Sequence, residues 1–367
     1  MNLECSKNKL QSAVLLAERV TGKNLSLPVL SYIVLEASNR ALKIKSTNLD
    51  LGLEISIPSK INKEGSVALN GSILGNFLSN LNLSEDRVKL ELIDGNLNIS
   101  SPNHSTKIKS YPTDDFPLIP KPDKPDSLDL KSQDLLEDLR YVWYSASISN
   151  LKAEISSVCL YNQADGLFWV ATDSFRLAEK KLTQKNIKAN LPYLIIPLKN
   201  IIEIMRIVDG LDLDLKIEYN KHQLSLRSEN FHLTSRLIDG VFPDYRQIIP
   251  THFTTQITVA RNELLPLLKL ANVFVDKLNQ AELSLNQEGK LEVKTTNDSG
   301  DNVAWINCEV VEGETLALSL NLKYLLDGLN AINSEKIVLG FNGPLKPMVV
   351  RGLDDPDFTY LIMPIRR

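Results

Sequence analysis

The chain has 367 residues, 43% hydrophobic and 23% charged, a composition typical of a folded protein with roughly two to four domains rather than a disordered one. Its three cysteines, Cys5, Cys159 and Cys308, are far apart and never form C-x-x-C, which argues against a disulfide framework or a zinc site and favours a cytoplasmic protein. The net charge of −4 excludes a uniformly basic nucleic-acid binder but not a local basic surface, and no apolar run approaches the ~18 residues of a membrane helix.

The first third of the chain predicts two helices set among short strands. A 3.6-residue apolar period predicts a helix over 7–20, and a strand follows at 32–37. Two more strands flank the pair Thr47-Asn48. A second helix is predicted over 72–81, and Asp94-Gly95 predicts a hairpin within 87–100.

This order returns twice, at intervals of about 125 residues, which indicates an internal triplication. The middle copy has helices near 134–147 and 198–208, the pair Thr172-Asp173 and a turn at Asn220-Lys221. The last copy has helices near 261–275 and 321–332, the pair Thr296-Asn297 and a turn at Asn342-Gly343. Proline-rich joints at 112–125 and 243–250 separate the copies. We therefore expect domains at 1–120, 127–250 and 251–367.

Each copy predicts an α+β unit in which two one-faced helices pack on a sheet. Units joined end to end form a curved array, and such an array closes into a ring when its ends meet head to tail. The six helical segments together carry a net positive charge although the chain as a whole carries −4. This sign suits a helix-lined inner wall that faces phosphates. Any single lysine or arginine is more often part of a solvated helix face, so only the collective bias carries information.

Several separated motifs resemble one family. The stretches ATDSFRLA (171–178), FPDYRQIIP (242–250) and YLIMPIRR (360–367), together with LPVLSYIVLEA (27–37), resemble the bacterial DNA polymerase III β subunits, the sliding clamps. The resemblance covers the whole chain and implies three similar clamp domains that form half of a head-to-tail dimeric ring. It also implies a non-catalytic processivity factor that encircles double-stranded DNA without sequence specificity and needs no cofactor. The implied partners are a second copy, the DNA polymerase III catalytic subunit, a clamp-loader ATPase complex and other clamp-motif proteins.

The resemblance further implies a hydrophobic pocket for partner peptides between the second and third domains. The residues carried over to it are Thr172, Ser174, Phe175, Arg176, Leu177, Pro243, Gln247, Ile248, Leu361, Met363, Pro364, Ile365 and Arg366. Without the resemblance, Leu177, Ile248 and Met363 read as ordinary core residues. Ser174 and Phe175 replace a Gly-His common in the family, Gln247 stands where a basic residue is frequent, and the chain ends in Arg367. The sequence therefore leaves the preferred peptide open.

Two further sets of residues follow from the resemblance. The expected dimer seam joins Thr106 and Ile108 of one chain to Asn272, Val273 and Leu278 of the other, although a valine such as Val273 is often simply exposed. The residues expected to face DNA are Lys23, Asn150, Lys152, Lys199 and Arg206. Their contacts with phosphates should be weak and salt-sensitive, because sliding forbids base readout.

An enzyme has little support in the sequence. None of the four histidines has metal-like spacing or a triad context, and no phosphate-binding loop of the G-x-x-x-x-G-K-[ST] type is present. Asp173 is conceivable as a base in a hydrolase of repeated α+β units, but its counterparts Asn48 and Asn297 favour a role in a turn. The nearer alternative to a clamp is a ring- or arc-shaped peptide-binding adaptor that does not encircle DNA.

Overall fold

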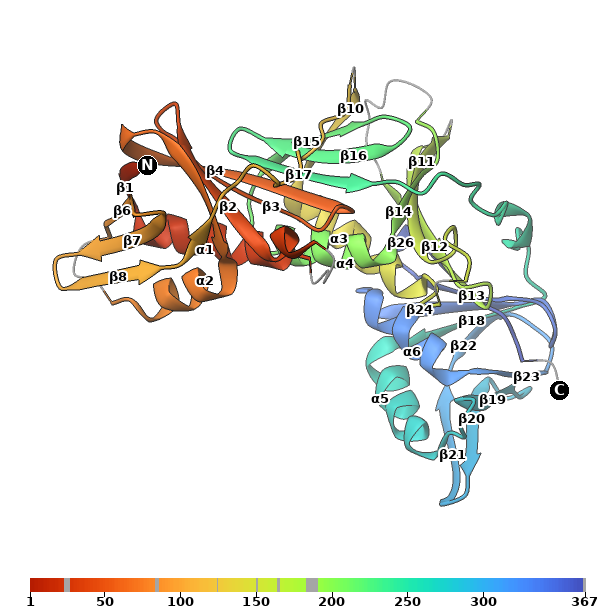
Figure 1. The fold of residues 1–367 in the computed structure, drawn as a ribbon. Coiled ribbons are helices and arrows are strands. Elements are labelled where there is room, and N and C mark those ends of the chain that lie inside the picture. Colours follow the sequence, from red (N-terminus) through yellow and green to blue (C-terminus); the bar gives the residue numbers. More distant parts are fainter. Residues whose placement is uncertain are drawn as a thin grey trace. The chain divides into compact units, whose positions relative to one another are not determined.

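The computed structural model describes residues 1–22, 27–82, 86–123, 125–149, 151–163, 166–182 and 191–365 (Figure 1). They form two compact units. Unit 1 contains Met1–Leu135 and Ile202–Leu237, and unit 2 contains Leu136–Ile201 and Ile238–Arg367. Two of the three cuts fall inside the helices at 132–142 and 198–208. The three predicted domains divide the chain differently, and their bounds stay a prediction.

The order β-α-β-β-β occurs twice in each third of the chain, as the sequence predicts. The first third contains β1 (Asn2–Cys5), α1 (Lys7–Arg19), β2 (Tyr32–Ser38), β3 (Ala41–Thr47), β4 (Leu51–Lys63), β5 (Gly65–Asn70), α2 (Gly71–Asn80), β6 (Val88–Ile93), β7 (Asn96–Ser101), β8 (His104–Ile108) and a short β9 (Ser110–Tyr111). The middle third contains β10 (Asp126–Lys131), α3 (Ser132–Val142), β11 (Ser157–Gln163), β12 (Gly166–Thr172), β13 (Arg176–Leu182), β14 (Leu194–Pro197), α4 (Leu198–Val208), β15 (Asp214–Tyr219), β16 (Gln223–Ser228) and β17 (Phe231–Arg236). The last third contains β18 (Thr255–Ala260), α5 (Arg261–Ala271), β19 (Gln280–Leu285), β20 (Lys290–Asn297), β21 (Gly300–Asn307), β22 (Glu309–Glu312), β23 (Leu316–Asn321), α6 (Leu322–Ala331), β24 (Lys336–Phe341), β25 (Met348–Gly352) and β26 (Asp355–Ile362).

Unit 1 is built on one antiparallel sheet of 13 strands. Its main path runs β10-β15-β16-β17-β4-β1-β6-β7-β8, and β2, β3, β5 and β9 branch from it. The register between β17 and β4 extends from Phe231↔Ile55 to Ser235↔Leu51, and Figure 1 shows these strands side by side. This pair joins the first third of the chain to the middle third through backbone hydrogen bonds. The sequence pattern predicts a sheet for each copy but not this continuation from one copy to the next.

The helices α1 and α2 begin at capped residues and bury one face. The Ser6 hydroxyl accepts a hydrogen bond from the Lys9 N–H at 3.1 Å and starts α1. The Asn70 side chain does the same for α2 through the Ile73 N–H. On α2, Gly75 allows close approach, because a Cβ there would lie 3.3 Å from the Leu15 side chain of α1. The predicted one-faced helices are therefore confirmed, and they pack on each other as well as on the sheet.

The joint between β17 and β4 contains a half-buried carboxylate, Glu54, beside a buried histidine, His232. His232 is opposite Glu54 in the register, and its Nδ1 lies 3.8 Å from the Glu54 carboxylate, which is too far for a hydrogen bond. Lys121 lies 3.7 Å from the same carboxylate. His232, and to a lesser degree Lys121 and Lys45, hold the pKa of Glu54 below its ordinary value, although burial acts in the opposite direction.

This pair predicts a pH-dependent contribution to stability. A carboxylate whose pKa is lowered by folding stabilises the protein above its unfolded pKa, and this stabilisation disappears as the pH falls through the lowered folded value. We expect Glu54→Gln to reduce the free energy of unfolding at pH 7 by about 1 kcal/mol, with the difference shrinking below about pH 4.5. Urea denaturation of both proteins from pH 3.5 to 7 measures this. A difference that stays constant over that range would contradict the charge argument.

Unit 2 contains two antiparallel sheets. The larger has nine strands in the order β14-β11-β12-β13-β26-β25-β24-β18-β22, and the smaller has the order β21-β20-β19-β23. Here β13 of the middle third pairs with β26 of the last third, from Arg176↔Ile362 to Lys180↔Phe358. As in unit 1, a strand pair thus joins neighbouring copies. Among the described residues, no helix is long and apolar enough to cross a membrane.

Candidate partner-binding surface in unit 2

The turn between β12 and β13 is fixed by its own side chains. The Thr172 hydroxyl donates to the Arg176 carbonyl at 2.7 Å and accepts from the Ser174 N–H at 3.1 Å. The Asp173 Oδ1 accepts from the N–H groups of Phe175 and Arg176, each at 2.9 Å. Ser174 takes the left-handed conformation at φ +78°, and the Phe175 side chain is left 63% exposed. The turn therefore presents an aromatic ring on a rigid support.

The same turn occurs in the first copy. The Thr47 hydroxyl donates a hydrogen bond to the Leu51 carbonyl at 2.7 Å, and the Asn48 side-chain oxygen accepts one from the Leu51 N–H at 2.7 Å. Leu49 takes the left-handed conformation at φ +77°. In the third copy the hairpin is tighter, because Asn297 pairs directly with Gly300. The repeated Thr-Asn/Asp pair thus builds a turn in the first two copies, and Asp173 has the turn role that the sequence favours over a catalytic one.

Arg176 anchors this turn to α6. Its side chain is 8% exposed, and its guanidinium lies 3.0 Å from the Asp173 carboxylate and 2.5 Å from the Asp327 carboxylate. It also lies over the ring of Tyr324, 4.4 Å from the centroid. Two carboxylates and one aromatic face therefore contact the Arg176 guanidinium. Arg176 therefore acts on the surface by holding the Phe175 turn in place.

The chain after β26 runs beside the turn. The Met363 N–H donates to the Phe175 carbonyl at 2.8 Å, and the Ile365 N–H donates to the Ser319 carbonyl at 2.7 Å. Met363, Pro364 and Ile365 are half-buried. These two backbone hydrogen bonds fix the segment 363–365 next to the exposed aromatic ring, so both belong to one surface.

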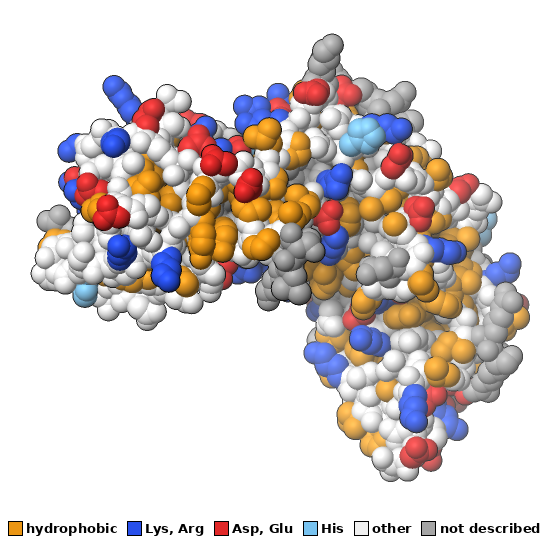
Figure 2. All heavy atoms as spheres, viewed as in Figure 1, with side chains coloured by type: hydrophobic (Ala, Val, Ile, Leu, Met, Phe, Trp, Pro, Cys, Tyr) orange, Lys and Arg blue, Asp and Glu red, His pale blue; other side chains and the backbone are white. Residues whose placement is uncertain are grey.

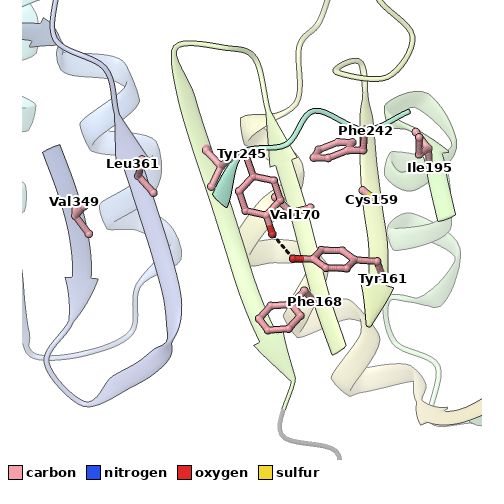
Figure 3. Packing of buried hydrophobic residues seen from close by; sticks show 10 residues of the cluster. Cys159, Tyr161, Phe168, Val170, Ile195, Phe242, Tyr245, Val349 and Leu361 are labelled. Atoms are coloured by element: carbon pink, nitrogen blue, oxygen red, sulfur yellow. Dashed lines mark hydrogen bonds between the residues drawn. The ribbon is translucent and has the colours of Figure 1, made fainter. Parts of the chain in front are cut away.

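A hydrophobic cluster joins the three motif segments. Leu177 of β13 and Leu361 of β26 are each 1% exposed, and they belong to the same cluster as Phe242 and Tyr245 of the FPDYR motif. Figure 3 shows the hydroxyl groups of Tyr161 and Tyr245 pointing at each other across this core. Leu177 and Leu361 therefore lie in the core beneath the surface, and a partner would not contact their side chains directly. The core interpretation fits Leu177, whereas Leu361 was expected only at the pocket.

A polar network holds the FPDYR segment on this core. The Tyr161 and Tyr245 hydroxyl oxygens are 2.5 Å apart, Tyr245 donates to the Glu179 carboxylate, and the Arg246 guanidinium donates to Tyr161 at 2.8 Å. Burial, and then the Glu179 charge, raise the pKa of Tyr245, which keeps its hydroxyl protonated as a donor. The network fixes the start of a single 3-10 turn, Arg246–Ile248, on which Gln247 and Ile248 are exposed. Pro243 is exposed as well.

The resemblance identified these motifs but not their internal partners. Glu179, Asp327 and Tyr324 are absent from the residues expected at the pocket, although they hold Tyr245 and Arg176 in place. Asp327 lies 151 residues from Arg176 along the chain, so no local pattern links the two. Arg366, also expected at the pocket, lies outside the described residues.

Close packing of α6 beneath this surface predicts a strong effect at one glycine. Tyr360 of β26 lies so near Gly328 that an added Cβ would clash with its ring, and the Tyr360 hydroxyl donates to the Tyr324 carbonyl at 2.8 Å. We expect Gly328→Ala to lower the free energy of unfolding by about 1–3 kcal/mol. Asn330→Ala, at an exposed position of the same helix, is the matched control and should change it by less than about 0.5 kcal/mol. Equal values for the two variants in urea denaturation would refute the packing argument.

The residues expected at the dimer seam are divided between the two units. Thr106 and Ile108 lie on β8, the end strand of the sheet of unit 1, where Thr106 is half-buried and Ile108 is buried. In unit 2, Asn272 and Val273 lie on a 3-10 turn, Asn272–Phe274, and Val273 is 66% exposed. Leu278 is exposed also.

Sequence reasoning missed an exposed tryptophan near the second set. Trp305 is 63% exposed on β21, the end strand of the four-stranded sheet, and Val303 on the same strand is exposed too. Both β21 and α5 pack against the 3-10 turn that carries Val273, and Figure 2 shows hydrophobic side chains at the surface around the end of α5. The alternation of inward and outward residues along β21 could have indicated that this tryptophan is exposed. Val303 and Trp305 occupy the same outward positions as the polar Asp301 and Asn307.

Of the residues expected to face DNA, Lys23 and Asn150 lie outside the described residues. Lys152 is exposed in a turn, and Lys199 and Arg206 are exposed on α4. Arg206 forms an ion pair with Glu203 at 2.6 Å. Lys199, Glu203 and Arg206 are spaced i, i+4, i+7 and so occupy one helix face of mixed charge. Figure 2 shows positive and negative side chains interspersed on the face of unit 1 in view.

The arrangement offers no centre for metal chemistry in the part of the chain that the structure describes, where no three His, Cys, Asp or Glu side chains lie close enough to hold an ion. Cys159 is buried in the hydrophobic cluster, and burial raises the pKa of its thiol. What the surface offers is an exposed aromatic ring, a fixed apolar segment at 363–365 and an exposed 3-10 turn. These features suit binding of a short extended peptide.

Comparison with known proteins agrees with the resemblance. Three family models match in succession: the N-terminal domain of the DNA polymerase III beta subunit over residues 1–120, its central domain over 129–244 and its C-terminal domain over 246–366. The beta sliding clamp of Synechococcus elongatus is 29% identical over 100% of this chain and 99% of its own length, and that of Staphylococcus epidermidis is 27% identical over 93% of each.

Solved structures show the same fold. The DNA polymerase sliding clamp from Bacillus subtilis is 24% identical and superposes with a TM-score of 0.94 over 100% of this chain and 99% of its own. The DNA polymerase III beta chain from Streptococcus pneumoniae is 25% identical, with a TM-score of 0.93 over 100% of both chains. With three domain models matched in order and relatives that span the whole chain, this protein belongs to the family of bacterial DNA polymerase III beta subunits, the beta sliding clamps.

Proposed function

We propose that this chain acts as a DNA sliding clamp, a processivity factor that encircles duplex DNA as a head-to-tail homodimeric ring and tethers the replicative polymerase. The observation that carries the proposal is the match of all three beta-subunit domain models in order along a thrice-repeated fold. A clamp-loader ATPase follows as a partner, because a closed ring must be opened before DNA can enter. The protein itself is not an enzyme in this proposal.

The proposed ring closes through the two end strands. Free edges such as β8 and β21 present unpaired backbone groups that favour pairing with another chain. Near β21, Val273, Leu278 and Trp305 expose apolar surface that a second copy would cover. We propose that β8 of one chain, with Thr106 and Ile108, meets this surface on the other chain.

The proposed hold on DNA is topological. Basic side chains such as Lys152 and Lys199 supply weak phosphate contacts. Because Arg206 forms an ion pair with Glu203, its own contribution to phosphate binding is smaller. Retention is therefore expected to depend on whether the DNA has ends. The test is loading by the clamp loader onto nicked circular DNA, followed by cutting with a restriction enzyme.

A clamp remains on the circle through gel filtration at about 0.2 M salt and is lost after the DNA is cut. Equal retention on circular and linear DNA would refute encirclement and favour the adaptor alternative.

We also propose that polymerase and other clamp-motif partners bind the surface formed by the Phe175 turn, the segment 363–365 and the 3-10 turn at 246–248. The support is the convergence of these segments on one buried cluster.

A further inference from the structure

Unit 1 contains a cavity whose lining shares no residue with the partner-binding surface. Its volume is about 490 Å³, and its walls come from α1, β4, the segment after α4 and the turn between β16 and β17. Pockets that bind small molecules usually measure about 300–1,000 Å³. The cavity is thus large enough for a drug-sized molecule, and no residue of the expected peptide, DNA or dimer sites lines it.

The body of the cavity is apolar. Its walls include Leu16 of α1, Ile55 and Ile57 of β4, Leu211, Leu213 and Phe231. Four of these, Leu16, Ile55, Leu211 and Leu213, are only half-buried, so they retain accessible apolar surface. Covering that surface with an apolar ligand releases water and provides the driving force for binding.

The polar groups of the lining set the charge of the ligand. Lys9 of α1 and Glu229 of the β16–β17 turn have opposite signs, so a charged ligand would be attracted by one and repelled by the other. The remaining polar lining is neutral and includes Ser12, Ser228 and Asn230. Hydroxyl and amide groups can orient a ligand without requiring charge.

We propose that this cavity binds a neutral, mainly apolar small molecule with one or two hydrogen-bonding groups. The ligand would touch α1 and β4 of the first copy together with the 211–213 segment and the β16–β17 turn of the middle copy. It would therefore add contacts beside the β17–β4 pair that joins the two copies, and a ligand that binds only the folded chain raises its melting temperature.

The test uses the full-length protein and the neutral fluorescent probe N-phenyl-1-naphthylamine. Ser12→Trp on α1 and Asn230→Trp in the β16–β17 turn each place an indole at the cavity lining, and both positions are exposed. The Asn230 carbonyl that accepts from the Ser56 N–H belongs to the backbone and is kept. Ser72→Trp, at an exposed position on α2 away from the lining, is the matched control.

We expect saturable fluorescence enhancement and a raised melting temperature with the unsubstituted protein. Each cavity variant should bind the probe at least about tenfold more weakly, and the control should stay within about twofold. Absent binding, or binding unchanged in whichever cavity variant folds, overturns the site. The anionic analogue 8-anilinonaphthalene-1-sulfonate should bind at least about tenfold more weakly than the neutral probe, and equal or tighter binding overturns the neutral ligand class.

Discussion

A chain carrying both Val273→Glu and Trp305→Glu is expected to be monomeric at micromolar concentration. Both side chains are largely exposed in the free chain, so the substitutions should change the free energy of unfolding by less than about 0.5 kcal/mol each. In the proposed dimer they would place two unpaired carboxylates in a covered apolar contact, and an unpaired buried charge costs several kcal/mol. Because each 1.4 kcal/mol is tenfold, the dimer dissociation constant should rise at least ~100-fold.

Sedimentation velocity over a concentration series measures the dissociation constant directly. Leu118→Glu combined with Leu353→Glu is the matched control, because it also places two charges at exposed leucines, neither of which belongs to the proposed seam. The monomeric variant should also be retained no better on nicked circular DNA than on linear DNA. A variant that remains a dimer at every concentration would contradict the place of the seam, and a wild-type chain that is monomeric throughout would remove the ring.

The elements that the sequence predicted well are those decided by local rules. The helix over 198–208 matches α4, since a strong 3.6-residue period runs directly from a strand into the helix. The Asp94-Gly95 hairpin matches as well, with both residues at positive φ as such a turn requires. The Thr172-Asp173 turn could be read from its repetition in the first copy.

Contacts between distant segments could not be read in this way. The pairing of β17 with β4 and of β13 with β26 depends on strands from different copies, and alternation along one strand does not name its neighbour. The resemblance placed Arg176 at the peptide pocket, yet Asp327 and Tyr324 of the last copy contact its guanidinium, and the side chain is buried. Position along a motif therefore predicted where the surface lies but not which side chains face outward.

Removal of residues 363–367 is expected to reduce polymerase stimulation to the level without the protein while the dimer persists. The deletion takes away half-buried apolar side chains and the hydrogen bonds from the Met363 and Ile365 N–H groups to the Phe175 and Ser319 carbonyls. It leaves β26, which ends at Ile362, in its sheet. Primer extension with the loader and polymerase measures stimulation, and sedimentation measures the dimer. Leu118→Ser, which removes an exposed apolar side chain in unit 1, is the control and should stimulate fully.

Phe175→Ser tests the contribution of the exposed ring independently of the segment 363–365. The hydrogen bond from the Met363 N–H is accepted by the Phe175 backbone carbonyl and therefore survives the substitution. An aromatic side chain at the centre of a binding surface contributes about 2 kcal/mol when it is a hot spot, so polymerase affinity should fall at least ~10-fold in this variant. The deletion should have the larger effect, since it removes both the segment and the support of the turn. If stimulation survives the deletion, polymerase binds elsewhere on the protein. If stimulation and dimer are lost together, the segment serves the fold rather than the partner.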